Sequence, residues 1–136
     1  MSNIEVDYLF PTAFWIADIK ENLEKKGTSL EDIAEACLKW ELEKPRRHRS
    51  NKGPKGYQSG DIAYEPHKDD PLNRLINEIH FAVEAIHQTH RHGTVAFMNA
   101  WINISRTGSR NAQHCHPGSI YSGVIYIQFP ENKTIY

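Results

Sequence analysis

The sequence predicts an α+β fold, mostly β with flanking helices, in a single domain over residues 1–136. Two patterns predict helices: a capping-box spacing at residues 28–31 and an apolar repeat of helical period that follows Pro71. A third pattern predicts strands, since residues 95–104 and 121–129 are rich in aromatic and β-branched side chains. A chain of 136 residues can bury a core without a disulfide or a structural metal.

The first third of the chain predicts an edge strand and two helices. Residues 4–16 alternate in polarity and are interrupted at Pro11, which indicates an edge strand. Residues 18–26 can form a short helix that ends at Gly27. The capping-box spacing then starts a second helix, whose apolar face is Leu30, Ile33, Ala34, Cys37 and Leu38. Cys37 is therefore expected in the core.

Residues 44–60 predict a basic loop. They carry six Lys and Arg residues and no acid, together with several prolines and glycines. Such a loop could bind phosphates, but no aromatic side chain lies between these cations before Tyr57. The pattern favours a solvated loop, and nucleic-acid binding stays the weakest alternative.

A long helix is predicted after this loop, with Asp69 or Asp70 as N-cap and Pro71 at the first position. Its apolar residues are Leu72, Leu75, Ile76, Ile79, Val83 and Ile86. Four histidines lie along the later part of this predicted helix, and no acidic residue completes a known metal-ligand spacing with them. We expect these to be surface residues: His80, His87, His90 and His92.

The last third predicts a sheet. Residues 93–136 are expected to form its first strands, after an N-terminal strand and helices in residues 1–92. The predicted elements are a strand at 95–104, a turn at 106–111, an extended piece at 114–116, a strand at 121–129, a hairpin turn at 130–132 and a returning strand at 133–136. A chain that ends inside a sheet leaves an open edge, through which we expect self-association.

Composition excludes several classes of partner and location. The formal net charge is -1, so no overall field draws the protein to nucleic acid or to an anionic membrane. No secretory signal and no apolar run of membrane-spanning length is present, and the two cysteines do not suggest a disulfide framework. The sequence therefore predicts a cytoplasmic, reduced protein with no membrane partner.

The chemistry of the chain is concentrated in His114-Cys115-His116-Pro117-Gly118-Ser119. Two residues apart on an extended chain, the side chains of His114 and His116 point to the same face, while Cys115 points away. Two neutral imidazoles suit a first-row divalent metal. By itself, however, such a pair is also common as a purely structural feature.

Several segments of the sequence resemble a family of iron(II) and 2-oxoglutarate dependent oxygenases common among phages and marine bacteria. The clearest is His114-x-His116-Pro117-Gly118-Ser119 followed by Ser122-Gly123-Val124-x-Tyr126, which resembles the family signature HxHPGSxxSGVxY. The other segments, in order, are Leu9-Phe10-Pro11-Thr12, Gly56-Tyr57-Gln58-Ser59 and Trp101-Ile102-Asn103.

The resemblance implies a double-stranded β-helix, a cupin-like jelly-roll of antiparallel strands with helices packed outside. It also implies an oxidoreductase, a dioxygenase that binds Fe(II), 2-oxoglutarate and O2 and hydroxylates a substrate that the sequence does not identify. In this class two histidines and one carboxylate hold the iron. If the gene is phage-encoded, the protein would work in the host cytoplasm.

Carried over position by position, the resemblance makes His114 the first metal ligand and puts His116 where the wider class has Asp or Glu. Either this subgroup uses three histidines or the carboxylate comes from elsewhere. Asn103, Tyr126, Ser119 and Ser122 are candidates for hydrogen bonds to 2-oxoglutarate. A cross-strand hydrogen bond for Asn103 and core packing for Tyr126 are the structural alternatives.

Family members continue beyond this point with a distal histidine and an arginine that binds 2-oxoglutarate, whereas no His or Arg follows His116 here. We therefore expect a fragment of a longer enzyme, with little activity of its own. Arg106 and Arg110 precede the motif and are not assigned as replacements. The alternative is a non-catalytic metal-binding or protein-interaction module.

Overall fold

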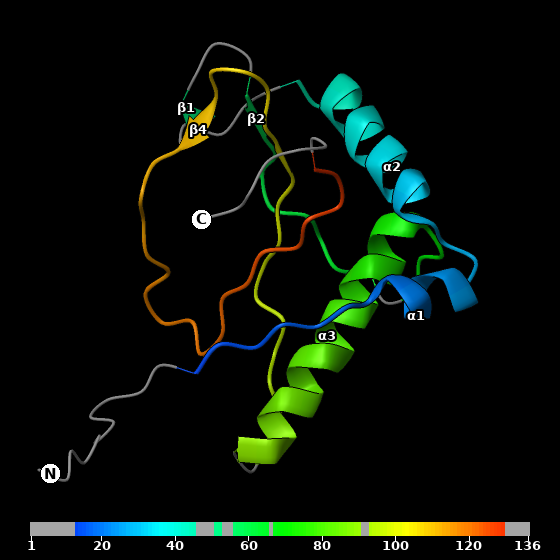
Figure 1. Ribbon diagram of the computed structural model, residues 1–136, viewed down its shortest axis with the longest axis vertical. Coiled ribbons are helices and arrows are strands. Elements are labelled where there is room, and N and C mark those ends of the chain that lie inside the picture. The colour runs from blue at the N-terminus through cyan, green and yellow to red at the C-terminus, as the bar shows by residue number, and fades with distance from the viewer. Residues whose placement is uncertain (1–12, 46–50, 53–55, 66, 91–92, 130–136) are drawn as a thin grey trace, which may run out of the picture.

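The computed structural model describes residues 13–45, 51–52, 56–65, 67–90 and 93–129. In these ranges the helices are α1 (Lys20–Lys25), α2 (Leu30–Glu43) and α3 (Pro71–His90). The strands are β1 (Asn51–Lys52), β2 (Tyr57–Gln58), β3 (Asn103–Ile104) and β4 (Arg110–Asn111). The helices lie on one side of the molecule, and long segments without regular structure from the last third of the chain lie on the other (Figure 1).

Helix α1 ends in a Schellman motif, as the glycine predicts. Gly27 has a φ of 72°, a conformation that costs a residue without a Cβ little. The amide of Thr28 donates to the carbonyl of Leu23 at 3.0 Å, and that of Gly27 donates to Glu24 at 2.9 Å. The expected short helix and its glycine stop are confirmed.

Helix α2 starts one residue later than the predicted capping box. Ser29 is the N-cap, and its hydroxyl accepts from the amide of Asp32 at 3.1 Å while the Asp32 carboxylate accepts from the Ser29 amide at 2.7 Å. This hydrogen bond from Ser29 holds the pKa of the Asp32 carboxyl below its usual range. The contribution of the box is fully present above the ordinary aspartate pKa and is lost as pH falls through the lowered one.

Helix α3 has the predicted start and is tied to the end of α1. Asp70 accepts the amide of Asn73 at 2.9 Å, and Pro71 is the first helical residue. The guanidinium of Arg74 donates to the carbonyls of Lys26 and Gly27 at 3.0 and 3.2 Å. These carbonyls belong to the end of α1, so Arg74 stabilises the angle between the two helices.

The core lies where the helices meet the segments around β2 and β3. Helix α3 packs against both α1 and α2. The buried cluster is Leu23, Ile33, Ile62, Leu72, Ile76 and Ile102. Cys37 is half-buried and packs against this cluster, as the helix pattern predicts.

The strands form two short antiparallel pairs. Strand β1 pairs with β4, and β2 pairs with β3 in a register that puts Tyr57 opposite Ile104 and Gln58 opposite Asn103. The second pairing continues past the strands, because the amide of Ile62 donates to Ala100 at 2.8 Å. A ribbon of irregular antiparallel pairing thus joins residues 57–62 to residues 100–104.

The predicted mostly β fold and its double-stranded β-helix are both wrong, because helices and irregular segments dominate the described residues. The described residues hold two two-stranded pairs and no jelly-roll, and the expected strand at 95–104 is regular only at Asn103–Ile104. Residues 121–129 form neither helix nor strand. Apolar and β-branched runs predict extended backbone, but a sheet also requires neighbouring strands that complete the hydrogen-bond ladder.

Other strand predictions have mixed outcomes. Residues 13–16 are not a strand, while the rest of the predicted opening strand and the hairpin after residue 129 lie outside the described residues. The apolar run at 121–129 predicts a strand with little exposed surface, yet Val124 is 73% and Tyr126 55% exposed. Among the described helices, none is long and apolar enough to span a membrane.

Substitution of Ile33 by Ala is expected to lower the free energy of unfolding by about 2–5 kcal/mol, because its side chain is fully buried and a cavity would remain. Leu42, on the same helix, is 81% exposed and provides the matched control. Leu42→Ala should change stability by less than about 0.5 kcal/mol. Urea denaturation followed by circular dichroism measures both, and equal effects would contradict the helix orientation described here.

Candidate metal site

The segment His116-Pro117-Gly118-Ser119 forms a tight turn. The amide of Ser119 donates to the carbonyl of His116 at 3.3 Å, and Gly118 has a φ of 83°. A type II β-turn requires a positive φ at its third position, where glycine is favoured, and proline is common at its second position. The turn reverses the chain directly after the two histidines and leaves Ser119 at its exit.

The rings of His114 and His116 lie next to each other. Their centroids are 4.8 Å apart and their planes meet at 74°. His114 is exposed and His116 is half-buried, while the thiol between them, Cys115, is exposed. The two imidazoles therefore form a pair that is accessible from solvent.

A hydrogen bond to the backbone sets the tautomer of His114. Its Nδ1 is 2.8 Å from the carbonyl oxygen of Ala112. Because a carbonyl can only accept, the proton of the neutral ring is on Nδ1, and Nε2 keeps a lone pair. A metal-binding histidine is commonly oriented in this way, with its second nitrogen donating to a carbonyl or carboxylate.

The sequence prediction did not include Trp101 in the site. Its indole stacks on the His116 ring with a centroid distance of 5.3 Å and an angle of 27° between the planes. The signal was present in the chain, because Trp101 belongs to one of the segments that resemble the oxygenase family. Only the folded chain shows which ring it contacts.

The four residues predicted to bind 2-oxoglutarate are all exposed and lie on different segments of the chain. Asn103 is exposed on β3, two residues from Trp101, so both side chains are on the same face of this extended segment. Ser119 and Ser122 are exposed on either side of Tyr121. Tyr126 is 55% exposed and its ring contacts Phe129 at 4.6 Å, which contradicts the alternative of core packing.

The arginines that precede the motif are used elsewhere or lie on a strand. The guanidinium of Arg106 donates to both carboxylate oxygens of Glu41, at 2.7 and 2.5 Å. This forked ion pair fixes the turn at residues 106–109 to α2. Arg110 lies on β4, with its Cα opposite that of Lys52.

His87 was predicted to be a surface residue, and this prediction is wrong. The residue is 4% exposed, and its Nδ1 is 3.1 Å from the hydroxyl of Tyr121. The rings of His87 and Tyr121 meet edge to face at 5.9 Å, as do those of Tyr121 and Trp15. This partly buried contact therefore fixes the signature region to the second half of α3. His80 is half-buried, and His90 and His92 carry no described side chain.

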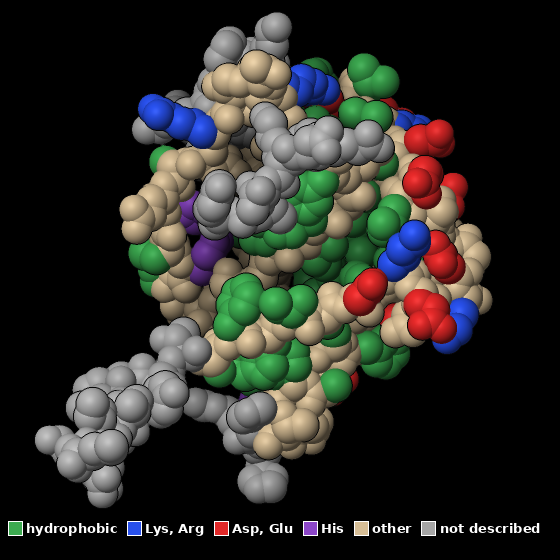
Figure 2. Space-filling model, viewed as in Figure 1, with side chains coloured by type: hydrophobic (Ala, Val, Ile, Leu, Met, Phe, Trp, Pro, Cys, Tyr) green, Lys and Arg blue, Asp and Glu red, His purple; other side chains and the backbone are tan. Residues whose placement is uncertain are grey.

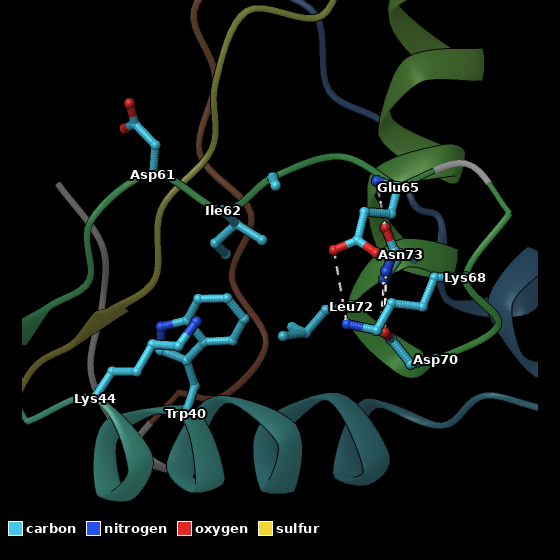
Figure 3. A pocket seen from close by; sticks show the side chains of 10 residues that line it. Trp40, Lys44, Asp61, Ile62, Glu65, Lys68, Asp70, Leu72 and Asn73 are labelled. Carbon is cyan, nitrogen blue, oxygen red and sulfur yellow. Dashed lines mark hydrogen bonds and ion pairs between the residues drawn. The ribbon is translucent and has the colours of Figure 1, made fainter.

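A hollow of about 200 Å³ lies apart from the signature residues, between α2, residues 61–65 and the start of α3 (Figure 3). Trp40 lines this hollow, and the Lys44 ammonium lies 3.7 Å from the centroid of its ring. The Lys68 ammonium is 3.3 Å from a carboxylate oxygen of Asp70, which also caps α3. The cationic side chains that line the hollow thus already have partners within the protein, and we assign no ligand to the hollow.

Histidine side chains border a recessed area on one face of the molecule, beside apolar side chains in its centre (Figure 2). Acidic side chains gather on the opposite margin of this face, on the side of the helices. Within the described ranges, no group of three or more His, Cys, Asp or Glu side chains could hold a metal ion.

Residues 99–135 match the family model described as "Putative 2OG-Fe(II) oxygenase". The resemblance to the 2OG-Fe(II) oxygenase superfamily is confirmed for this segment. It contains Trp101, both histidines of the pair and all four candidate 2-oxoglutarate ligands. No curated protein and no solved structure matches the chain.

The two cysteines are expected to differ strongly in reactivity. Burial raises the pKa of the Cys37 thiol to about 11, so about one part in a thousand is thiolate at pH 8. Cys115 is exposed. With Ellman's reagent at pH 8 one thiol should react quickly and one slowly, and Cys115→Ser should remove the fast phase alone. Equal rates in the folded protein would contradict the burial of Cys37.

Loss of the His87 contact should destabilise the protein measurably. Tyr121→Phe leaves the Nδ1 of a buried ring without its partner, at an expected cost of about 1–3 kcal/mol. His87→Phe together with Tyr121→Phe should cost less than the sum of the two single changes, because the second change removes no further hydrogen bond. Additive losses in urea denaturation would show that the two side chains are not coupled.

Proposed function

We propose that the chain carries part of the iron site of an Fe(II) and 2-oxoglutarate dependent oxygenase, with His114 and His116 as metal ligands. The observation that carries the proposal is the adjacency of the two imidazole rings, 4.8 Å apart, within the segment that matches this family. The match supports the reaction class and not a particular substrate. The substrate therefore remains outside the proposal.

The spacing of the rings fits two ligands of one metal ion. Two imidazole nitrogens about 2.1 Å from a metal, at about a right angle, would put their ring centroids about 4.6 Å apart. The observed separation is 4.8 Å. Nδ1 of His114 already lies at a carbonyl oxygen, which leaves Nε2 for a metal. In this proposal the pair would supply two positions of a six-coordinate site, and the other positions would be left for further ligands.

When bound, iron(II) would supply the redox chemistry, with 2-oxoglutarate and O2 as cosubstrates. The protein residues would bind the metal and orient 2-oxoglutarate. Asn103 is the best-supported candidate for 2-oxoglutarate, because it shares a face with Trp101, whose ring contacts His116. Ser119 follows at the exit of the turn that starts at His116. Ser122 and Tyr126 are proposed on the family resemblance.

His116 remains the departure from the usual pattern of two histidines and a carboxylate. An imidazole in place of a carboxylate leaves the bound iron with one more unit of net positive charge. A more positive site would favour anionic ligands, and 2-oxoglutarate is a dianion at neutral pH. We propose that a carboxylate or a third histidine from outside the described residues completes the site.

The intact gene product that carries this sequence should convert 2-oxoglutarate to succinate in the presence of Fe(II) and air, in uncoupled turnover without added substrate. His114→Ala should lower this rate by more than about 100-fold, since loss of an outer-shell partner alone costs 10–100-fold. His67→Ala is the matched control, because His67 is an exposed histidine before α3, outside the oxygenase-matched segment.

Anaerobic titration of this chain with Fe(II) separates the two candidate functions. We expect weak binding that His114→Ala abolishes, since two imidazoles alone hold iron poorly. Metal binding without succinate formation by the intact gene product would favour the non-catalytic metal-binding module. Unchanged turnover in His114→Ala would refute the assignment of this residue as a ligand.

A further inference from the structure

The ring of His116 is in contact with two other rings. The His114 ring is 4.8 Å away and nearly perpendicular, and the Trp101 indole is 5.3 Å away and nearly parallel. A parallel contact with a large aromatic face restricts rotation of the imidazole about its χ2 torsion, which is otherwise broad. Trp101 therefore contributes to the direction in which the His116 nitrogens point.

The position of Trp101 is set by the pairing of its segment with residues 57–62. The Ile102 amide donates to the Ser59 hydroxyl at 2.9 Å, and the Ser59 amide donates to the Ile102 carbonyl at 3.0 Å. Ile102 is 7% exposed and lies in the core cluster. Since neighbouring side chains of an extended segment alternate in direction, the burial of Ile102 turns Trp101 to the other face, toward His116.

We infer that Trp101 is a positioning residue of the proposed metal site, acting through His116. This inference rests on the proposed function, since it requires that His116 binds a metal. An imidazole that coordinates a divalent cation is more electron-poor than a free one. The negative face of an indole attracts such a ring more strongly, as in a cation–π contact. Trp101 thus favours the metal-bound form in addition to orienting the ring.

The expected size of this effect is about two- to five-fold in the dissociation constant, as for a cation–π contact at an exposed site. The probe is Ni²⁺, which is stable in air and binds imidazole sites more tightly than Fe²⁺. In calorimetric titrations Trp101→Leu should weaken Ni²⁺ binding by this factor. Trp101→Phe keeps an aromatic face and should lose less. Urea midpoints establish that the variants are folded.

Tryptophan fluorescence gives a second measurement that does not depend on affinity. Ni²⁺ quenches an indole at short range, so Trp101 should account for most of the quenching in the wild-type protein. Trp101→Phe should lose this quenching. Trp40→Phe is the matched control and should keep it, because Trp40 lies in the hollow between α2 and α3, which no signature residue lines.

The outcomes separate this inference from the proposed function. If the wild-type protein does not bind Ni²⁺, or if His114→Ala binds Ni²⁺ as tightly as wild type, the metal site itself is refuted. The role of Trp101 is then refuted with it. If wild-type binds Ni²⁺ and folded Trp101→Leu binds it equally well, Trp101 has no positioning role while the metal site stands. Quenching that persists in Trp101→Phe has the same meaning.

Discussion

The irregular antiparallel pairing of residues 57–62 with residues 100–104 holds the two parts of the chain together. It joins the helical part of the chain to its last third through a hydroxyl as well as through backbone groups, since Ser59 accepts the Ile102 amide. Ser59 is 1% exposed, so this hydrogen bond is shielded from water and costly to leave unmade. It commits Ile102 to the core and Trp101 to the opposite face.

Two further contacts hold the segment with the histidines in place. The forked ion pair of Arg106 with Glu41 fixes the turn before it to α2. The hydrogen bond of Tyr121 with His87 fixes the chain after it to α3. Each contact joins residues far apart in the sequence. The conformation of residues 106–121 is therefore maintained by contacts with helices α2 and α3, which precede this segment in the chain.

The chemistry of the candidate site follows from this support. His114 is oriented by a carbonyl two residues away, whereas His116 is oriented by an indole that the paired ribbon positions. The first contact is local and inexpensive to form, and the second requires the tertiary fold. A metal that binds both rings would therefore couple the turn after His116 to the core, because Trp101 contacts His116 and belongs to the paired segment.

Features whose interactions span four or five residues can be predicted from the amino-acid sequence alone. The glycine stop of α1 and the aspartate–proline start of α3 are local patterns of this kind, which composition and spacing reveal. The adjacency of the two histidine rings belongs to the same class, because side chains two residues apart on an extended chain share a face.

Which extended runs pair, and which side chains those pairings bury, depends on contacts between distant parts of the chain. The runs at 95–104 and 121–129 predict extended backbone equally well, yet only the first obtains a partner strand in the described residues. The burial of His87 and the stacking of Trp101 on His116 are likewise contacts between distant segments. Pairing partners lie many residues away, and local propensity carries no information about them.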